Sequence, residues 1–167
     1  VAKAASMILA EKKGGRLHLV GIGKPAGICR LVASSLSSTG TAAYFLDAAE
    51  AVHGGAGQVK RGDVVIAVSN SGETLEVKSA VTLVQAGGPQ VIGVSGRAGS
   101  WLSRASDLHL EAGVKQEGDP LNLAPRASVL AELFVLNVLS VTLQTARGLT
   151  AAEFRRWHPA GSLGKKK

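Results

Sequence analysis

The sequence predicts a single α/β domain built as a three-layer α-β-α sandwich around a five-stranded parallel sheet. Its 167 residues, 46% of them apolar, suffice for one sizeable core. Short Val-, Ile- and Leu-rich runs alternate with segments whose apolar residues recur at helical spacing. Twenty-one glycines against five prolines favour tight turns between such elements over disorder.

The first elements are a helix, a strand and a second helix. Residues 1–13 carry Ala, Met, Ile and Leu at helical spacing and end in Lys12-Lys13-Gly14-Gly15, a plausible C-terminal stop. Arg16–Ile22 is a largely apolar strand that ends in a glycine turn. The apolar residues of 28–36 then return to a period near 3.6, which predicts a helix.

The same strand and helix unit recurs along the rest of the chain. The later predicted strands are Ala42–Leu46, Asp63–Val68, Gln90–Val94 and Asp107–Leu110, and the helices are Ala48–Val52, Leu75–Gln85, Ser100–Ala105 and Ala127–Ala146. Such alternation predicts a mostly parallel sheet that binds ligands at the carboxyl ends of its strands. Gly113–Ala124 is too long for a simple connection, and we expect a lid or an interface arm there.

Composition excludes several classes of function. Cys29 is the only cysteine, so we expect a reducing, cytoplasmic setting and a small buried thiol at this position. Uninterrupted apolar runs fall short of the roughly 20 residues that a membrane span needs, and we predict no membrane partner. The net charge of +7 is concentrated in a basic tail that includes Lys165, Lys166 and Lys167. With only 4% aromatic residues we predict no nucleic-acid partner, but an electrostatic bias toward anionic small molecules.

The most informative segment is Ser69-Asn70-Ser71-Gly72-Glu73-Thr74, which joins a buried strand to a helix. Hydroxyl groups, backbone N–H groups, a glycine and a helix N-terminus together make a phosphate cradle. The alternative is an ordinary helix start, in which Ser71 or Thr74 is the N-cap and Glu73 or Glu76 assists. Both interpretations use the same donors.

Nucleotide sites fit less well than a sugar phosphate. Gly21-Ile22-Gly23-Lys24-Pro25-Ala26 offers only an alanine for the last glycine of a dinucleotide fingerprint, and no G-x-x-x-x-G-K-[ST] motif occurs. We therefore predict no ATP, NAD or other cofactor. Lys24 follows a strand at the ligand edge, where it can neutralise a phosphate or a developing enediolate, unless it is merely an exposed lysine.

Six motifs occur in the order seen in one family. They are Gly21-Ile22-Gly23-Lys24, Ser38-Thr39-Gly40-Thr41, Ala49-Glu50-Ala51-Val52-His53-Gly54, Ser69–Thr74, Leu123-Ala124-Pro125 and His158-Pro159-Ala160-Gly161-Ser162-Leu163-Gly164. Over nearly its whole length the chain resembles the sugar isomerase (SIS) domain of arabinose-5-phosphate isomerases. The resemblance implies the SIS fold and a homodimer or homotetramer with active sites near subunit contacts. Enediol chemistry needs no metal, and we predict none.

The resemblance also implies which residues form the site. The catalytic set falls on Lys24, His53, Glu76 and His158. The phosphate-binding set falls on Gly23, Ser69, Asn70, Ser71, Gly72 and Thr74. Aldose–ketose isomerisation needs a ring-opening acid or base, a base that moves a proton between C1 and C2, and electrophiles for the enediolate.

These roles can be distributed over the four residues. Glu76 lies one helical turn from the cradle and suits the C–H base, whereas His158 suits ring opening. Lys24 and His53 would stabilise or protonate substrate oxygens, and one of them can come from a neighbouring subunit. Alternatively, Glu76 is a surface carboxylate and the histidines are structural.

The chain also departs from the family pattern. Pro25-Ala26 stands where the family has Ser-Gly, Asp119-Pro120 replaces Cys-Pro, and Arg126 begins a run that is elsewhere rich in Thr and Ser. We predict an isomerase of the arabinose-5-phosphate type, acting on ribulose 5-phosphate through an enediol. The alternatives are a noncatalytic sugar-phosphate sensor and a SIS isomerase for a different phosphosugar.

Overall fold

A computed structural model describes residues 1–10 and 15–162 of the chain. Its sheet has the strand order β2-β1-β3-β4-β5, and all neighbouring strands are parallel. The strands are β1 Leu17–Gly21, β2 Ala43–Asp47, β3 Val64–Val68, β4 Gln90–Ser95 and β5 Leu108–Glu111. The predicted five-stranded parallel sheet is confirmed.

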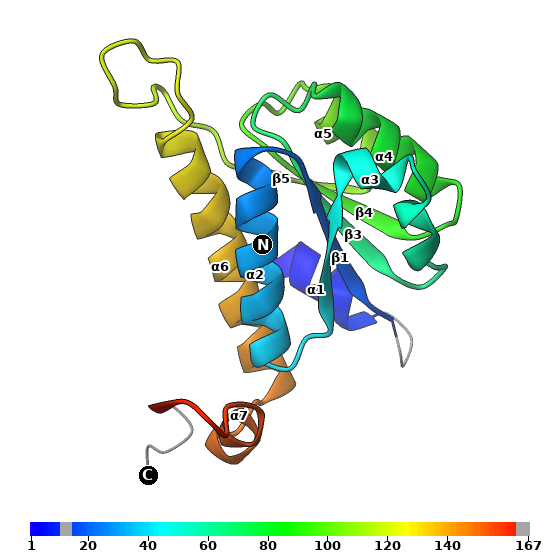
Figure 1. Ribbon diagram of the computed structural model, residues 1–167, viewed down its shortest axis with the longest axis vertical. Helices are drawn as coiled ribbons and strands as arrows, with labels where there is room; N and C mark the ends of the chain where they lie inside the picture. The colour runs from blue at the N-terminus through cyan, green and yellow to red at the C-terminus, as the bar shows by residue number, and fades with distance from the viewer. Residues whose placement is uncertain (11–14, 163–167) are drawn as a thin grey trace.

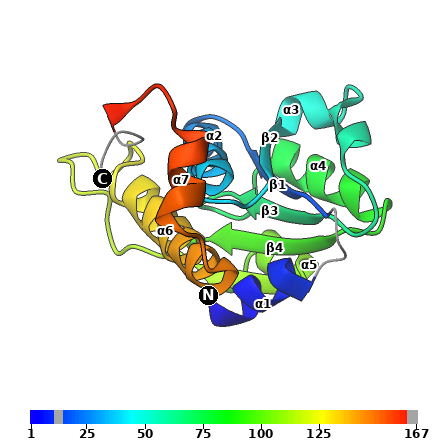
Figure 2. The same cartoon turned by 90° about the horizontal axis from the view of Figure 1, so that it is seen from below.

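Helices cover both faces of this sheet (Figures 1 and 2). They are α1 Ala2–Ala10, α2 Lys24–Ser38, α3 Ala48–Ala51, α4 Leu75–Gln85, α5 Trp101–Ala105, α6 Ala127–Arg147 and α7 Ala151–Trp157, with a 3-10 turn η1 at Gly55–Gln58. Helices α1, α2 and α6 pack on one face, and α3, α4 and α5 pack on the other. The predicted three layers are confirmed.

The central strand β3 shows why a separate hydrophobic core lies on each face of the sheet. Side chains alternate along a strand, so Ile66 and Val68 enter the core under α2 and α6, while Val65 and Ala67 enter the core under α4. All five β3 residues are buried. The continuous apolar run of β3 is therefore the pattern of a strand covered on both faces.

Two elements were not predicted, η1 and α7. Helix α7 starts with a capping box, in which Thr150 Oγ1 accepts from the Glu153 amide at 3.2 Å and Glu153 Oε2 accepts from the Thr150 amide at 2.9 Å. The T-x-x-E pattern at Thr150–Glu153 was thus a usable signal in the sequence. The predicted stop at Lys12-Lys13-Gly14 and the basic tail at 165–167 lie outside the described residues.

Helix α6 carries an apolar stripe that faces outward. Within the described part of the chain it is the one helix long and apolar enough to cross a membrane by length and composition, although Asn137 interrupts its apolar runs. It packs against α1 and α2, yet only 28% of its most apolar window is buried. The exposed members of the stripe are Leu130, Phe134, Val138 and Val141.

Candidate functional site

Three of the four predicted catalytic residues lie at the carboxyl edge of the sheet. Lys24 is the first residue of α2 after β1, His53 follows α3 after β2, and Glu76 is in the first turn of α4 after β3. All three side chains are exposed. Because β2, β1 and β3 are neighbours, these residues come from adjacent loops at the edge where parallel sheets bind ligands.

The turn after β3, Ser69–Thr74, is organised by its own hydroxyl groups. The Gly72 amide donates to the Ser69 carbonyl at 2.9 Å and to Ser69 Oγ at 3.2 Å, and the Glu73 amide donates to Ser71 Oγ at 3.1 Å. Ser69 Oγ and Thr74 Oγ1 are also hydrogen-bonded at 2.9 Å. These contacts fix the backbone of the turn. We call Ser69–Thr74 the cradle.

Thr74 occupies the N-cap position of α4, as the alternative interpretation expected, but its side chain does not cap the helix. The Thr74 hydroxyl instead contacts Ser69. The first amides of α4 thus have no side-chain acceptor in residues 1–10 and 15–162, and the positive end of an 11-residue helix opens onto the cradle. Such an end binds phosphate well.

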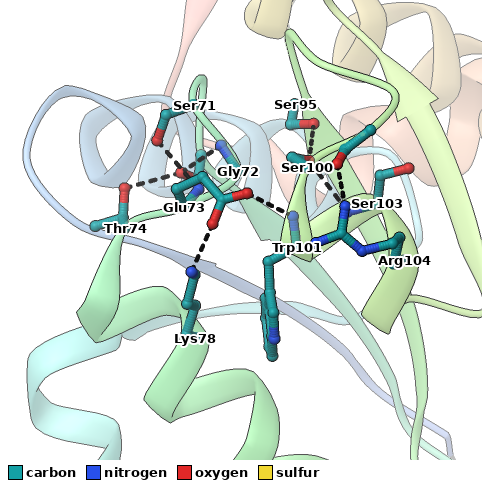
Figure 3. A network of polar contacts seen from close by, with 12 residues as sticks. Ser71, Gly72, Glu73, Thr74, Lys78, Ser95, Ser100, Trp101, Ser103 and Arg104 are labelled. Carbon is teal, nitrogen blue, oxygen red and sulfur yellow. Dashed lines mark hydrogen bonds and ion pairs between the residues drawn. The ribbon is translucent and has the colours of Figure 1, made fainter.

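Gly72 is required by the packing of the cradle. It has a φ of 65°, and a Cβ placed there would lie 2.2 Å from Ser100 Oγ. The Gly72 carbonyl accepts from the Leu102 amide of α5 at 3.0 Å. The backbone of the cradle therefore rests directly on the start of α5 (Figure 3).

Glu73 is fixed by neighbouring helices and differs in this from Glu76. Its Oε1 accepts from the Trp101 amide at 2.8 Å, and its Oε2 lies 2.5 Å from Lys78 Nζ (Figure 3). The hydrogen bond from Lys78, followed by that from Trp101, lowers the pKa of Glu73. Glu76 makes no side-chain hydrogen bond or ion pair with the described residues, which leaves its carboxylate available for chemistry.

The remaining predicted phosphate-binding residues are Gly23, at the start of α2, and Asn70, within the cradle. Gly23 is the N-cap of α2 with a φ of 63°, and no side chain caps that helix either. The Asn70 backbone carbonyl accepts a hydrogen bond from the Gly96 amide at 2.9 Å. Two uncapped helix starts, those of α2 and α4, thus lie at adjacent strands β1 and β3.

His158 is not brought to this edge within one chain. It is the C-cap of α7, its Nδ1 bonds to the Phe154 carbonyl at 2.7 Å, and its ring stacks on that of Phe154 at 4.0 Å. The adjacent Trp157 ring lies beside Gly40, in the turn before β2, where a Cβ would come within 3.2 Å of the ring. Helix α7 therefore lies at the amino ends of the strands, opposite the cradle (Figure 1).

Sequence reasoning missed a buried polar pair on α6. Ser128 and Glu132 are each 1% exposed, and among the described residues neither Ser128 Oγ nor either Glu132 carboxylate oxygen has a hydrogen-bond partner. Burial, and to a lesser extent the charge of Glu117, raises the pKa of Glu132 to about 7. The only signal in the sequence was a lone Glu in an apolar helix, four residues after a Ser. No three His, Cys, Asp or Glu side chains in residues 1–10 and 15–162 cluster as a metal site.

Comparisons with known proteins agree with this architecture. The model of the SIS domain family matches residues 8–142. Arabinose 5-phosphate isomerase KdsD of Pseudomonas aeruginosa is 41% identical over 164 residues, which cover 98% of this chain and 50% of that protein. KdsD of Escherichia coli K12 is 41% identical over 152 residues, which cover 91% of this chain and 46% of the relative.

A solved structure has the same fold over nearly all of this chain. The structure of c3406 of E. coli CFT073 in complex with A5P superposes with a TM-score of 0.90 at 35% identity, covering 95% of this chain and 83% of that one. The chain spans about half the length of the curated relatives that it matches. By the extent of the family match and the shared fold, the chain belongs to the SIS domain family.

Proposed function

We propose that this chain isomerises a phosphorylated sugar between its aldose and ketose forms, in the manner of arabinose-5-phosphate isomerases. One observation carries the proposal: an uncapped, hydroxyl-lined helix start lies one turn from the exposed carboxylate of Glu76, which pairs with none of the described residues. The 41% identity to proteins named arabinose 5-phosphate isomerase supports ribulose 5-phosphate and arabinose 5-phosphate as the substrate pair.

The cradle holds the phosphate. Amides of the first turn of α4 and the hydroxyls of Ser69, Ser71 and Thr74 donate to the phosphate oxygens, with Asn70 and Gly72 shaping the turn and Gly23 adding the α2 start. Binding at this fixed point directs the sugar carbons toward Glu76. Glu76 then removes a proton from one of C1 and C2 and returns it to the other.

Cationic and hydrogen-bonding groups stabilise the charge that this proton transfer creates. Lys24 follows β1, which neighbours β3, and His53 follows β2, the next strand beyond β1, so both lie on the same edge as Glu76. An ammonium group or an imidazole N–H placed near the C1 or C2 oxygen lowers the energy of the enediolate. No cofactor or metal enters these steps.

Ring opening by His158 requires a second copy of the chain. Within one chain His158 lies at the edge opposite Glu76, so the histidine that serves a given cradle comes from a neighbouring subunit. The exposed apolar stripe of α6 supports such an assembly, because Phe134 and Leu130 are 69% and 66% exposed. We infer a homodimer or homotetramer that acts in the cytoplasm, in which residues 1–167 form one SIS domain.

Replacing Glu76 by Gln tests the proposal. The amide keeps the size of the side chain but accepts no proton, so we expect turnover of arabinose 5-phosphate to fall about a thousand-fold. Binding of the sugar phosphate, measured by calorimetry, should change by less than about threefold, since the cradle is intact. Glu111→Gln, at an exposed strand position, is the matched control and should retain full turnover.

A noncatalytic sugar-phosphate sensor is the second candidate. It is favoured by one observation, that a single chain contains the whole cradle but separates His158 from Glu76. A sensor would bind arabinose 5-phosphate without exchanging the C2 proton with solvent, in the wild type and in Glu76→Gln alike. Proton exchange with a different pentose or hexose phosphate would instead support isomerisation of another sugar.

A further inference from the structure

A polar pocket adjoins the cradle on the side away from Lys24 and His53. It has a volume of about 360 Å³ and is lined by Asn70 and Ser71 of the cradle, by Arg97 after β4, and by Lys115 after β5. Strand order places it toward β4 and β5, whereas Lys24 and His53 follow β1 and β2. None of the proposed catalytic residues lines it. We call it the β3–β4 pocket.

Close backbone contacts build the walls of this pocket. The Gly96 amide donates to the Asn70 carbonyl, and a Cβ at Gly96 would lie 2.6 Å from Asn70 Oδ1. A Cβ at Gly113 would lie 2.9 Å from the Gly96 carbonyl oxygen. Glycines at both positions allow the segments after β3, β4 and β5 to approach, which brings Arg97 and Lys115 to one hollow from two different loops.

The charges in the pocket favour an anion. Arg97 and Lys115 are exposed, and neither forms an ion pair with a residue of the described ranges. The pocket also holds one carboxylate, Glu117, whose Oε2 accepts from the amides of Arg126 and Ser128 at 2.7 and 3.0 Å. Glu117 thus stabilises the start of α6, while the two cations have no such partner.

We propose that the β3–β4 pocket binds a second oxyanion, a phosphate or carboxylate, beside the phosphate in the cradle. The proposal rests on the proposed function, because it takes the cradle as the first phosphate site. Asn70 and Ser71 line the pocket and belong to the cradle, so a single small ligand can reach both. The arginine can grip an oxyanion with two N–H groups, and the lysine adds a point charge.

Two non-isomerisable probes that differ by one phosphate test this. Calorimetry would compare arabinitol 5-phosphate with arabinitol 1,5-bisphosphate on the whole chain. We expect the bisphosphate to bind roughly ten-fold more tightly, as two partly solvated charge contacts allow. In Arg97→Ala/Lys115→Ala that preference should disappear, with the affinity for arabinitol 5-phosphate unchanged within about twofold.

A charge-matched control removes the general electrostatic effect. Lys60 and Arg61 are exposed at the amino end of β3, and Lys60→Ala/Arg61→Ala loses the same net charge far from the pocket. This variant should keep the preference for the bisphosphate. A second arm titrates inorganic phosphate into protein saturated with arabinitol 5-phosphate. Saturable phosphate uptake that Arg97→Ala/Lys115→Ala abolishes would support the site and identify its anion as a separate molecule.

The outcomes separate the two proposals. If arabinitol 5-phosphate binds but neither the bisphosphate preference nor phosphate uptake is seen, the pocket proposal alone is overturned. The same follows if the preference survives in Arg97→Ala/Lys115→Ala or is lost equally in Lys60→Ala/Arg61→Ala. If arabinitol 5-phosphate itself does not bind, the proposed function fails and the pocket proposal fails with it.

Discussion

The two edges of the sheet use buried polar groups in opposite ways. At the amino edge, the Asp63 carboxylate accepts from the amides of Arg16 and Lys60, from the Arg16 guanidinium, and from His18. At the carboxyl edge, the cradle leaves the first amides of α4 without side-chain acceptors. A buried carboxylate whose oxygens are satisfied by neighbouring donors stabilises a fold, whereas a turn with unused donors is ready for a ligand.

The pKa values at the amino edge follow from the hydrogen bonds that Asp63 accepts. Burial alone would raise the pKa of Asp63, but the amides of Arg16 and Lys60 and the side chains of His18 and Arg16 together lower it. Burial also lowers the pKa of His18, against the opposing effect of Asp63. The Asp63 carboxylate is therefore ionised in the folded state and is the organising charge of that edge.

The largest expected effect comes from removing that charge. Asp63→Ala leaves the Arg16 and Lys60 amides and the His18 ring without their acceptor, so we expect a loss of about 3 to 5 kcal/mol in the free energy of unfolding. Urea titration measures it. Calorimetric affinity for arabinitol 5-phosphate, at a temperature where the variant is folded, should match the wild type. A comparable loss of affinity would contradict the separation of the two edges.

The second prediction concerns Glu132, a buried carboxyl without the partners that Asp63 has. Its folded pKa of about 7 lies above the ordinary value of 4.5. The folded protein therefore retains a proton that the unfolded chain releases, and this contribution is lost as pH rises from about 4.5 to about 7. Stability should fall by about 3 kcal/mol across that interval, as measured by urea titration at several pH values.

Comparison with Glu132→Gln isolates this contribution. The amide does not titrate, so the variant should lose this decline with pH while the contribution of His18, which has the opposite sign, remains. Glu50→Gln, an exposed position on α3, serves as the control and should behave as the wild type. Parallel pH profiles for wild type and Glu132→Gln would show that Glu132 finds a partner in solution.

The smallest expected effect is a loss of ligand affinity. Gly72→Ala places a methyl group against Ser100 Oγ and forces an alanine to a positive φ, which distorts the cradle. We expect the affinity for arabinitol 5-phosphate to fall roughly 30-fold, or about 2 kcal/mol. Gly99→Ala, where a Cβ meets open space, is the control and should bind normally. Equal affinity of both variants would argue against phosphate binding in the cradle.

Particular residues show how far the sequence could lead. The apolar run of β3, the glycines and hydroxyls that follow it, and the period of α4 sufficed to predict both elements and the turn between them. Helix α7 was missed even though its capping box is local, because its short helix carries little apolar periodicity. Glu132 was missed because burial is a property of the packed α2–α6 interface, not of neighbouring residues.

The sequence by itself determined the α/β class, the succession of strands and helices along the chain and the chemistry of the cradle, because these depend on residues close together in the chain. The tertiary structure alone decided which loops meet at each edge. It brought Lys24, His53 and Glu76 to one edge of the sheet and set His158 at the other. It also placed Arg97 and Lys115 in the lining of one pocket. These contacts between distant segments depend on the order of the strands in the sheet and on how closely the backbones approach, and no local sequence pattern predicts either.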